Sequence, residues 1–263
     1  MNEILHSFAL WLRQAHFEAL ILESAVFMFW LLPTLASAGT GSIGSERKSM
    51  LEIKPSATGE VVRVTPKRRQ IALTFDAGDG VDALPELLAA LRDASVKSTF
   101  FLTGEWAKRY LNSAKQIVAD GHEIGNHSWS HPDLTRLSDR DISWELKRAD
   151  TEIRSFYGHS TRPLFRAPFG ARNQRVLGVA EALGYRSIYW SLDSLDSVGS
   201  PKSTSFIVAR VTGQPDQVLD GAIVLFHVGN ESTARALPEI LRILKARHFE
   251  CVVVSSRIPT SKK

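Results

Sequence analysis

The chain has 263 residues, of which 44% are hydrophobic and 23% charged, and its formal net charge is +4. These proportions are typical of a folded globular domain, and so small a positive excess without a block of lysine and arginine argues against nucleic acid as a partner. A single cysteine, Cys251 within an apolar run, excludes an intrachain disulfide and is expected in the core.

An apolar stretch near the N-terminus indicates export. Residues 24–36 are mostly apolar, and their end together with the next two residues has the A-x-A pattern of a signal-peptide cleavage site. We therefore expect residues 1–38 to be a signal peptide or an uncleaved membrane anchor, because residues 19–38 are long enough to span a bilayer. A true start downstream of Met1 also stays open. We therefore expect an exported protein, either secreted or attached to a membrane. We also expect it to be a monomer.

The rest of the chain is interpreted as a linker at 39–62, rich in Gly, Ser, Lys and Glu, and a folded domain over 63–258. In this domain, apolar runs typical of strands alternate with amphipathic patterns typical of helices. The predicted strands are 71–75, 98–102, 122–125, 164–167, 186–192, 222–226 and 250–254. The predicted helices are 84–91, 104–120, 139–157, 173–183, 203–211 and 233–246. The alternation predicts an α/β fold with a mostly parallel sheet, open or closed into a barrel.

Polar residues end or directly follow five of the predicted strands. They are Asp76, His127, Arg166, Asp193 and His227. Because sites in parallel α/β folds form at the carboxyl ends of the strands, these side chains are predicted to share one site. Any one of them could instead cap a helix or lie at the surface, but five equivalent positions favour a common function.

Two histidines four residues apart, His127 and His131, are the clearest local signal. On one face of a helical turn, both imidazoles would reach the same metal ion. Neutral imidazole suits Zn²⁺, Co²⁺ or Ni²⁺, and a carboxylate would be a natural third ligand. The spacing alone occurs often by chance, so it needs support from other residues.

That support comes from five motifs in order along the chain. They are Thr74-Phe75-Asp76-Ala77-Gly78, His127-Ser-Trp-Ser-His131, Arg166-Ala-Pro-Phe-Gly170, Asp193-Ser-Leu-Asp196 and Leu225-Phe-His227. Together they resemble the motifs of the polysaccharide deacetylases of carbohydrate esterase family 4, the NodB-homology domain. The resemblance implies a distorted (β/α)7 barrel. It also implies metal-dependent hydrolysis of N-acetyl groups on the amino sugars of a polysaccharide such as peptidoglycan or chitin, with release of acetate.

The resemblance implies catalytic roles for four residues. Asp76 matches the base that activates water, and Arg166 matches the arginine that pairs with it. His227 matches the general acid, and Asp193 matches the carboxylate that orients this histidine. A carboxylate beside an arginine stays ionised near neutral pH, as a base must, whereas a nearby carboxylate favours the charged form of a histidine.

The resemblance also implies the binding residues. His127 and His131 match the ligands of a divalent metal ion, for which zinc is the first expectation and cobalt, nickel or manganese are alternatives. The backbone around Phe169 matches the position that stabilises the oxyanion, and Leu225 matches the residue that lines the pocket for the acetyl methyl group.

The chain departs from the family pattern at a metal ligand. Ala77 stands where the usual first motif has a second aspartate, the third ligand, and alanine cannot bind a metal. Two histidines plus water would bind the ion more weakly. Asp79 and Asp82 are alternative third ligands, although their residue type also suits turns and helix caps.

A second departure concerns the acetyl pocket. Ser197 stands where the fourth motif usually carries the tryptophan that forms a wall of this pocket. Trp190 is expected in the core, and the orientation of Trp129, between the two histidines, stays open. Two other functions therefore compete with deacetylation. One is carbohydrate binding without catalysis, and the other is hydrolysis of a different non-peptide C–N bond on the same scaffold.

Overall fold

The computed structural model describes residues 59–65 and 68–258. These lie in the second of the two units into which the chain divides, Pro55–Lys263. The signal peptide or anchor expected at 1–38 and most of the expected linker lie outside the described residues. Within the described ranges, no helix combines the length and the apolar character that a membrane span requires.

A parallel sheet forms the centre of this unit. Its strands follow the order β5-β4-β3-β2-β1-β7-β6, and β8 pairs with the start of β1. The strands are β1 (Gln70–Ala77), β2 (Thr99–Leu102), β3 (Glu123–Asn126), β4 (Leu164–Phe165), β5 (Arg186–Ser187), β6 (Leu192–Asp193), β7 (Ile223–His227) and β8 (Glu250–Cys251). The predicted α/β fold with a mostly parallel sheet is therefore confirmed, and the sheet is curled as a half-barrel.

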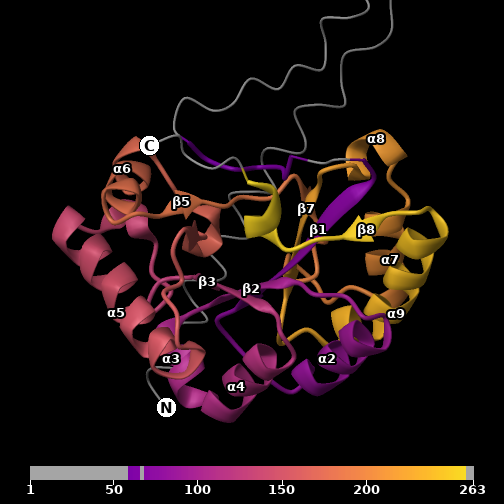
Figure 1. The fold of residues 1–263 in the computed structure, drawn as a ribbon, viewed down its shortest axis with the longest axis horizontal. Helices are drawn as coiled ribbons and strands as arrows, with labels where there is room; N and C mark the ends of the chain where they lie inside the picture. Colours follow the sequence, from indigo (N-terminus) through magenta and orange to yellow (C-terminus); the bar gives the residue numbers. More distant parts are fainter. Residues whose placement is uncertain (1–58, 66–67, 259–263) are drawn as a thin grey trace, which may run out of the picture. The chain divides into compact units, whose positions relative to one another are not determined.

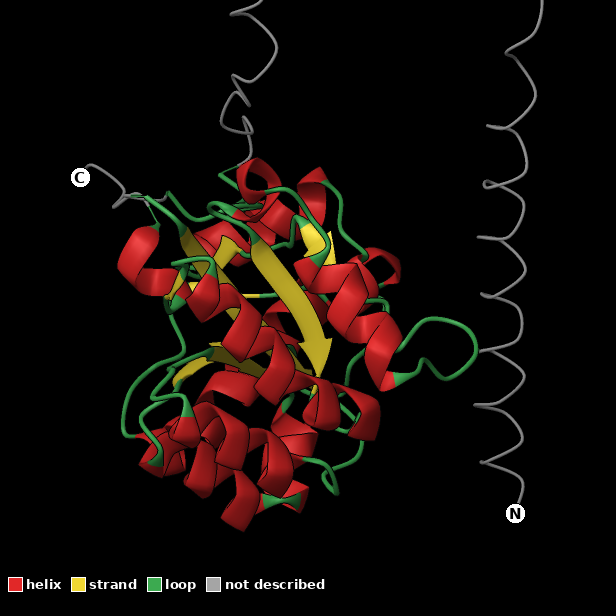
Figure 2. Cartoon of the chain, turned by 90° about the vertical axis from the view of Figure 1, so that its right-hand side faces the viewer, coloured by secondary structure: helices red, strands yellow, loops and turns green. Residues whose placement is uncertain are grey.

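Helices surround this sheet, as Figures 1 and 2 show. They are α2 (Leu84–Asp93), α3 (Gly104–Arg109), α4 (Leu111–Ala119), α5 (Asp139–Tyr157), α6 (Gln174–Ala182), α7 (Thr204–Thr212), α8 (Asp216–Leu219) and α9 (Glu231–Ala246). The longest, α5, begins at Ser138, whose hydroxyl accepts a hydrogen bond from the Asp141 backbone, and ends at Gly158 in the left-handed region with φ 78°. The bounds of α5 are those predicted from the sequence, and serine at the start and glycine at the end are residue types that suit these positions.

Two predicted elements are divided in the structure. The helix expected at 104–120 breaks at Tyr110, whose backbone leaves the helical region with φ −115° and ψ 47° while its ring packs against Trp106. The strand expected at 186–192 becomes β5 and β6, because the residues between them bond elsewhere. Tyr189 donates its backbone N–H to the carbonyl of Val61, and Ser191 donates to that of Ile223.

A segment before β1 bridges to two distant parts of the sheet, near β5 and near β7. Val61 bridges to Ile188 beyond β5, and Arg63 bridges to Ala222 before β7. The Arg63 guanidinium also donates to the carbonyl oxygens of Val218 and Asp220, at 2.7 and 2.6 Å. Packing against the half-barrel thus already includes Val61, at the end of the segment interpreted as a linker.

The alternation of side chains along β1 separates the core from the site. Phe75 is fully buried and stacks on Phe100 and Phe226, with ring centroids 5.0 and 5.4 Å apart. Burying one such ring stabilises the fold by about 1.5–3 kcal/mol. Thr74 and Asp76 face the other side of the strand, because successive side chains alternate. Asp76 therefore lies at the carboxyl end of β1, on the inner side of the curled sheet.

Candidate active site

Asp76 and Arg166 form a buried ion pair at the centre of the site. Arg166 Nη1 donates to Asp76 Oδ1 at 2.7 Å, and its Nε donates to the carbonyl oxygen of Ile188. Arg166 is completely buried and Asp76 is 6% exposed. Burial would raise the pKa of Asp76, but the charge and hydrogen bond of Arg166, with the nearby imidazoles, lower it below its ordinary value. Asp76 is therefore ionised near neutral pH.

His127 is fixed in one orientation beside this pair. Its Nδ1 lies 2.9 Å from the carbonyl oxygen of Arg166, which can only accept, so Nδ1 carries the proton. Its Nε2 is then left with a lone pair, and this atom lies 3.5 Å from Asp76 Oδ2. Burial lowers the pKa of His127, which keeps the ring neutral.

The loop 127–131 is not the helical turn that the spacing predicted. Ser128 and His131 have φ values of 68° and 60°, so the chain passes twice through the left-handed region. The backbone N–H groups of Trp129 and Ser130 both donate to Glu145 Oε2 at 2.8 Å, which holds the loop in this shape. The two rings still converge, because the centroids of His127 and His131 are 4.9 Å apart.

These two histidines fit a divalent ion as ligands. Both are neutral imidazoles, since burial also lowers the pKa of His131, to about 3. No cluster of three or more His, Cys, Asp or Glu able to hold a metal is found among the described residues. Ala77 is completely buried, and Asp79 accepts a hydrogen bond from the Gly80 backbone in an exposed turn. A bound ion would therefore depend on two imidazoles, with water or substrate in its remaining positions.

The carboxylate that orients His227 is Asp196, so the expectation that Asp193 does so is wrong. His227 Nδ1 donates to Asp196 Oδ1 at 2.7 Å, and the His227 backbone N–H donates to Oδ2 at 2.9 Å. Thr233 Oγ1 donates to the same Oδ2 at 2.7 Å. Burial would lower the pKa of His227, but the hydrogen bond and charge of Asp196 outweigh it and raise the pKa above its ordinary value.

Asp193 is the last residue of β6, before Asp196 in the chain, and has other partners. Its Oδ1 accepts the backbone N–H of Leu195 at 2.7 Å, and its carbonyl oxygen accepts from Arg210 Nε. It acts on His227 only through its charge. The chain reverses at Leu195, with φ 61°, and this turn brings Asp196 under His227. The second aspartate of the fourth motif was the signal in the sequence, but spacing could not tell which carboxylate the turn brings in.

Ser197 completes a line of polar groups through His227. Its hydroxyl oxygen lies 3.3 Å from His227 Nε2, so the ring contacts a carboxylate at one nitrogen and a hydroxyl at the other. Ser197 is exposed, which leaves this side of the pocket open where the family resemblance places a tryptophan. Trp190 is partly buried, and its ring stacks on that of Tyr189 with centroids 3.9 Å apart. It packs against a cluster of buried hydrophobic side chains that includes Val61 and Ile188.

Phe169 and Leu225, the residues expected to bind substrate, differ in exposure. Phe169 is 60% exposed, with φ 57°, and the centroid of its ring is 4.4 Å from that of His131. A non-glycine residue held in the left-handed region is uncommon and often marks a functional loop. Leu225 is buried on β7, where it pairs with Thr74 of β1. The structure thus brings all eight site residues expected from the sequence to the same end of the sheet.

Comparison with known proteins agrees with this geometry. The family model for polysaccharide deacetylases matches residues 63–188. A chitooligosaccharide deacetylase of Azorhizobium caulinodans is 31% identical over 74% of this chain and 97% of its own length. A peptidoglycan-N-acetylglucosamine deacetylase of Bacillus cereus is 30% identical over 74% of this chain and 70% of its own length.

Solved structures share the fold at similar identity. A pseudoenzyme of carbohydrate esterase family 4 from Bacillus anthracis is 29% identical, with a TM-score of 0.70 over 79% of this chain and 70% of its own. A mutant of that protein with restored enzymatic activity is 30% identical, with a TM-score of 0.71, and covers 79% of this chain and 72% of its own. The chain therefore belongs to the polysaccharide deacetylases of carbohydrate esterase family 4, the NodB-homology hydrolases that act on the C–N amide bonds of acetylated polysaccharides.

Proposed function

We propose that this protein removes N-acetyl groups from the amino sugars of peptidoglycan or a chitin-like polymer, with a divalent metal ion bound to His127 and His131. Relatives named as chitooligosaccharide and peptidoglycan-N-acetylglucosamine deacetylases support the substrate class. Such an ion, when bound, would polarise the carbonyl of the acetamido group and so make this poor electrophile reactive.

Asp76 and His227 would carry the two proton transfers. Ionised Asp76 takes a proton from water, whose oxygen forms the new bond to the carbonyl carbon. His227, charged through its pair with Asp196, gives the Nε2 proton to the sugar nitrogen as the C–N bond breaks. Acetate and a free amino sugar are then released. Asp76 and His227 are paired residues on the neighbouring strands β1 and β7, so they reach the same substrate group.

One observation carries this proposal. The pKa of Asp76 is lowered and that of His227 is raised, although the two residues are paired on adjacent strands. Two titratable groups whose environments push their pKa values apart can act as base and acid at the same pH. A site that only bound glycans would have no use for this separation.

Acetate release from purified peptidoglycan and from chitooligosaccharides would test the proposal. The protein is first treated with a chelator and then assayed with Zn²⁺, Co²⁺, Ni²⁺ or Mn²⁺ restored. We expect metal-dependent release that disappears in Asp76→Ala and His227→Ala but persists in Asp79→Ala, a matched exposed carboxylate of the next turn. Folded protein without release on either polymer and with any of these metals would contradict the proposal.

Carbohydrate binding without turnover is the second candidate, and Ala77 favours it. The site lacks a third side-chain ligand among the described residues, and a structural relative is itself a pseudoenzyme. Equilibrium binding of chitooligosaccharides by the same protein would decide between the candidates. Binding in the micromolar range together with no acetate release would make this reading the better one.

We also propose that the protein is exported, on the basis of residues 1–38. An exported enzyme would meet a polymer that lies outside the cytoplasm, which agrees with the proposed substrate class. Fractionation of cells that express the whole chain would place it in the extracytoplasmic or membrane fraction, and recovery only in the cytoplasm would contradict this.

A further inference from the structure

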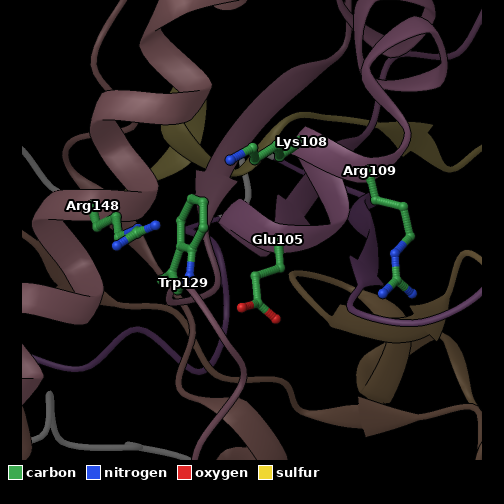
Figure 3. A pocket seen from close by; sticks show the side chains of 5 residues that line it. All are labelled: Glu105, Lys108, Arg109, Trp129 and Arg148. Atoms are coloured by element: carbon green, nitrogen blue, oxygen red, sulfur yellow. The ribbon is translucent and has the colours of Figure 1, made fainter.

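A charged pocket lies between helices α3 and α5, next to the histidine loop (Figure 3). Its volume is about 560 Å³, and its lining consists of one tryptophan, three cationic side chains and one carboxylate. These residues are Trp129, Lys108, Arg109, Arg148 and Glu105. None of them takes part in the chemistry proposed above.

The pocket is fixed to the loop that carries both histidines. Trp129 lies between His127 and His131 in the sequence, and its ring covers the backbone of Gly104 so closely that a Cβ there would lie 2.2 Å from it. Glu105 donates its backbone N–H to the carbonyl oxygen of Trp129 at 3.0 Å. Trp129 thus packs against the start of α3, and a polymer bound across the histidines would have this pocket beside it.

Two aromatic rings hold Arg148 in place, and no residue in the described ranges accepts a hydrogen bond from its guanidinium group. The carbon at the centre of its guanidinium group lies 4.1 Å from the ring centroid of Trp129 and 4.8 Å from that of Trp144. Such stacking orients the charge while the N–H groups stay available to an anion. Trp144 is 47% exposed and offers an aromatic face beside this cation, which suits the apolar face of a sugar ring.

The other cations of the pocket are also unneutralised. Lys108 and Arg109 project from one helix, and both are exposed. In the part of the chain that the structure describes, neither has an ion pair, and neither do Arg148 and Glu105, whereas other arginines on the surface, such as Arg242, are paired. Three cations with one carboxylate leave a positive field that a neutral glycan cannot use.

We propose that this pocket binds a carboxylate carried by the polymer, so that the protein prefers a glycan bearing acidic substituents over a neutral one. The inference rests on the proposed function, which leaves peptidoglycan and a chitin-like polymer open as substrates. It favours the polymer that carries carboxylates. The peptide-substituted strands of peptidoglycan carry such carboxylates, and chitooligosaccharides carry none. Guanidinium groups and carboxylates form charge-assisted hydrogen bonds, which are shorter and stronger than those between neutral groups.

Two matched substrates would test this inference. The kcat/KM of deacetylation is measured on glycan oligomers of equal length, with and without carboxylate-bearing peptides, at low and at high salt. The variants are Lys108→Gln/Arg109→Gln, Glu105→Gln and, as a control with two equally exposed cations elsewhere, Lys115→Gln/Arg154→Gln.

The expected changes differ in sign. Loss of two cations lowers kcat/KM on the acidic oligomer about three- to tenfold, and loss of the Glu105 carboxylate raises it about twofold, because exposed charges have modest effects that salt screens. Neither change alters activity on the neutral oligomer, and the control variant leaves both substrates unaffected. Equal effects on both oligomers, or no effect on either, would overturn the inference.

Equilibrium binding of both oligomers separates this inference from the proposed function. If no variant releases acetate, the proposed function fails, and the pocket is then judged by its preference in binding alone. A polyol phosphate oligomer is included as a competitor. If it displaces the acidic oligomer more strongly than a carboxylate of equal charge does, the pocket binds phosphate and the assignment to carboxylates is wrong.

Discussion

At the scale of single residues, the site depends on which atom of each histidine is occupied. His127 donates a hydrogen bond from Nδ1 to a backbone carbonyl, and His227 donates one from Nδ1 to a carboxylate. The first arrangement leaves a neutral ring with a free lone pair, as a metal ligand requires, whereas the second favours a charged ring, as an acid requires. The same residue type thus acquires two functions from the partner at Nδ1.

The contact between His227 and Asp196 gives a prediction that separates two aspartates. Asp196→Asn should lower kcat on the order of 10³-fold, because an amide supports neither the tautomer nor the charge of the ring. Asp193→Asn should have a much smaller effect, since Asp193 acts on the ring only through its charge. Acetate release by both variants, with circular dichroism to confirm folding, is the measurement. Equal losses would return Asp193 to the role that the sequence suggested.

The ion pair between Arg166 and Asp76 gives a prediction about stability. Arg166→Met should lower the free energy of unfolding by roughly 3–5 kcal/mol, because it leaves a buried carboxylate without its partner. Asp76→Asn/Arg166→Met should be less destabilised than Arg166→Met alone, since the uncompensated charge is then gone. Urea unfolding at pH 7 measures both variants. A double variant less stable than Arg166→Met would contradict the assignment of the loss to the uncompensated Asp76 charge.

At the scale of secondary-structure elements, polar contacts with neighbouring helices and strands fix the shape of the loops around the site. The histidine loop is held by Glu145 of α5 and by the start of α3, not by helical hydrogen bonds of its own. The junction between α4 and β3 has a comparable feature, because His122 is buried there against the Phe100 ring at 5.0 Å. Its Nδ1 accepts the backbone N–H of Ser98, and its Nε2 has no hydrogen-bond partner among the residues that the structure describes.

This junction predicts a loss of stability in mild acid. Burial is the main cause that lowers the pKa of His122, from 6.5 to about 4. The unfolded chain therefore binds the proton first, and stability falls as the pH drops from 6.5 towards 4, by roughly 2–3 kcal/mol in all. His122→Gln should remove this contribution. Urea unfolding at pH 7.5 and pH 5 compares the two proteins, and an unchanged pH dependence in the variant would count against His122.

At the scale of the whole folded unit, segments distant in sequence close the half-barrel. Val61 and Arg63 connect the regions next to β5 and β7, and β8 adds to β1 from late in the sequence. The site lies where β1, β3, β4 and β7 end, so each of its polar groups comes from a different part of the chain. Any ligand that joins two of these groups will therefore stabilise the fold as a whole.

Metal binding should appear as such a stabilisation. Zn²⁺ at about 100 times its dissociation constant should add roughly 2.7 kcal/mol to the free energy of unfolding, and this gain should disappear in His131→Asn. Thermal unfolding with and without the metal, after chelation, is the measurement. Because the proposed site offers the ion two imidazoles among the described residues, we expect saturation at micromolar or higher concentration. The same gain in His131→Asn would place the metal elsewhere.

The sequence by itself determined the alternation of strands and helices, the ends of α5, and the set of polar residues at the strand ends. These features can be predicted because they depend on local periodicity and on the types of residue at the ends of the strands. Only the tertiary structure decided that Asp196 and not Asp193 reaches His227, that the histidine loop is not helical, and that Trp129 lines a charged pocket. Backbone turns at Ser128, His131 and Leu195 settle these contacts, and such turns are stabilised by distant partners that spacing along the chain does not reveal.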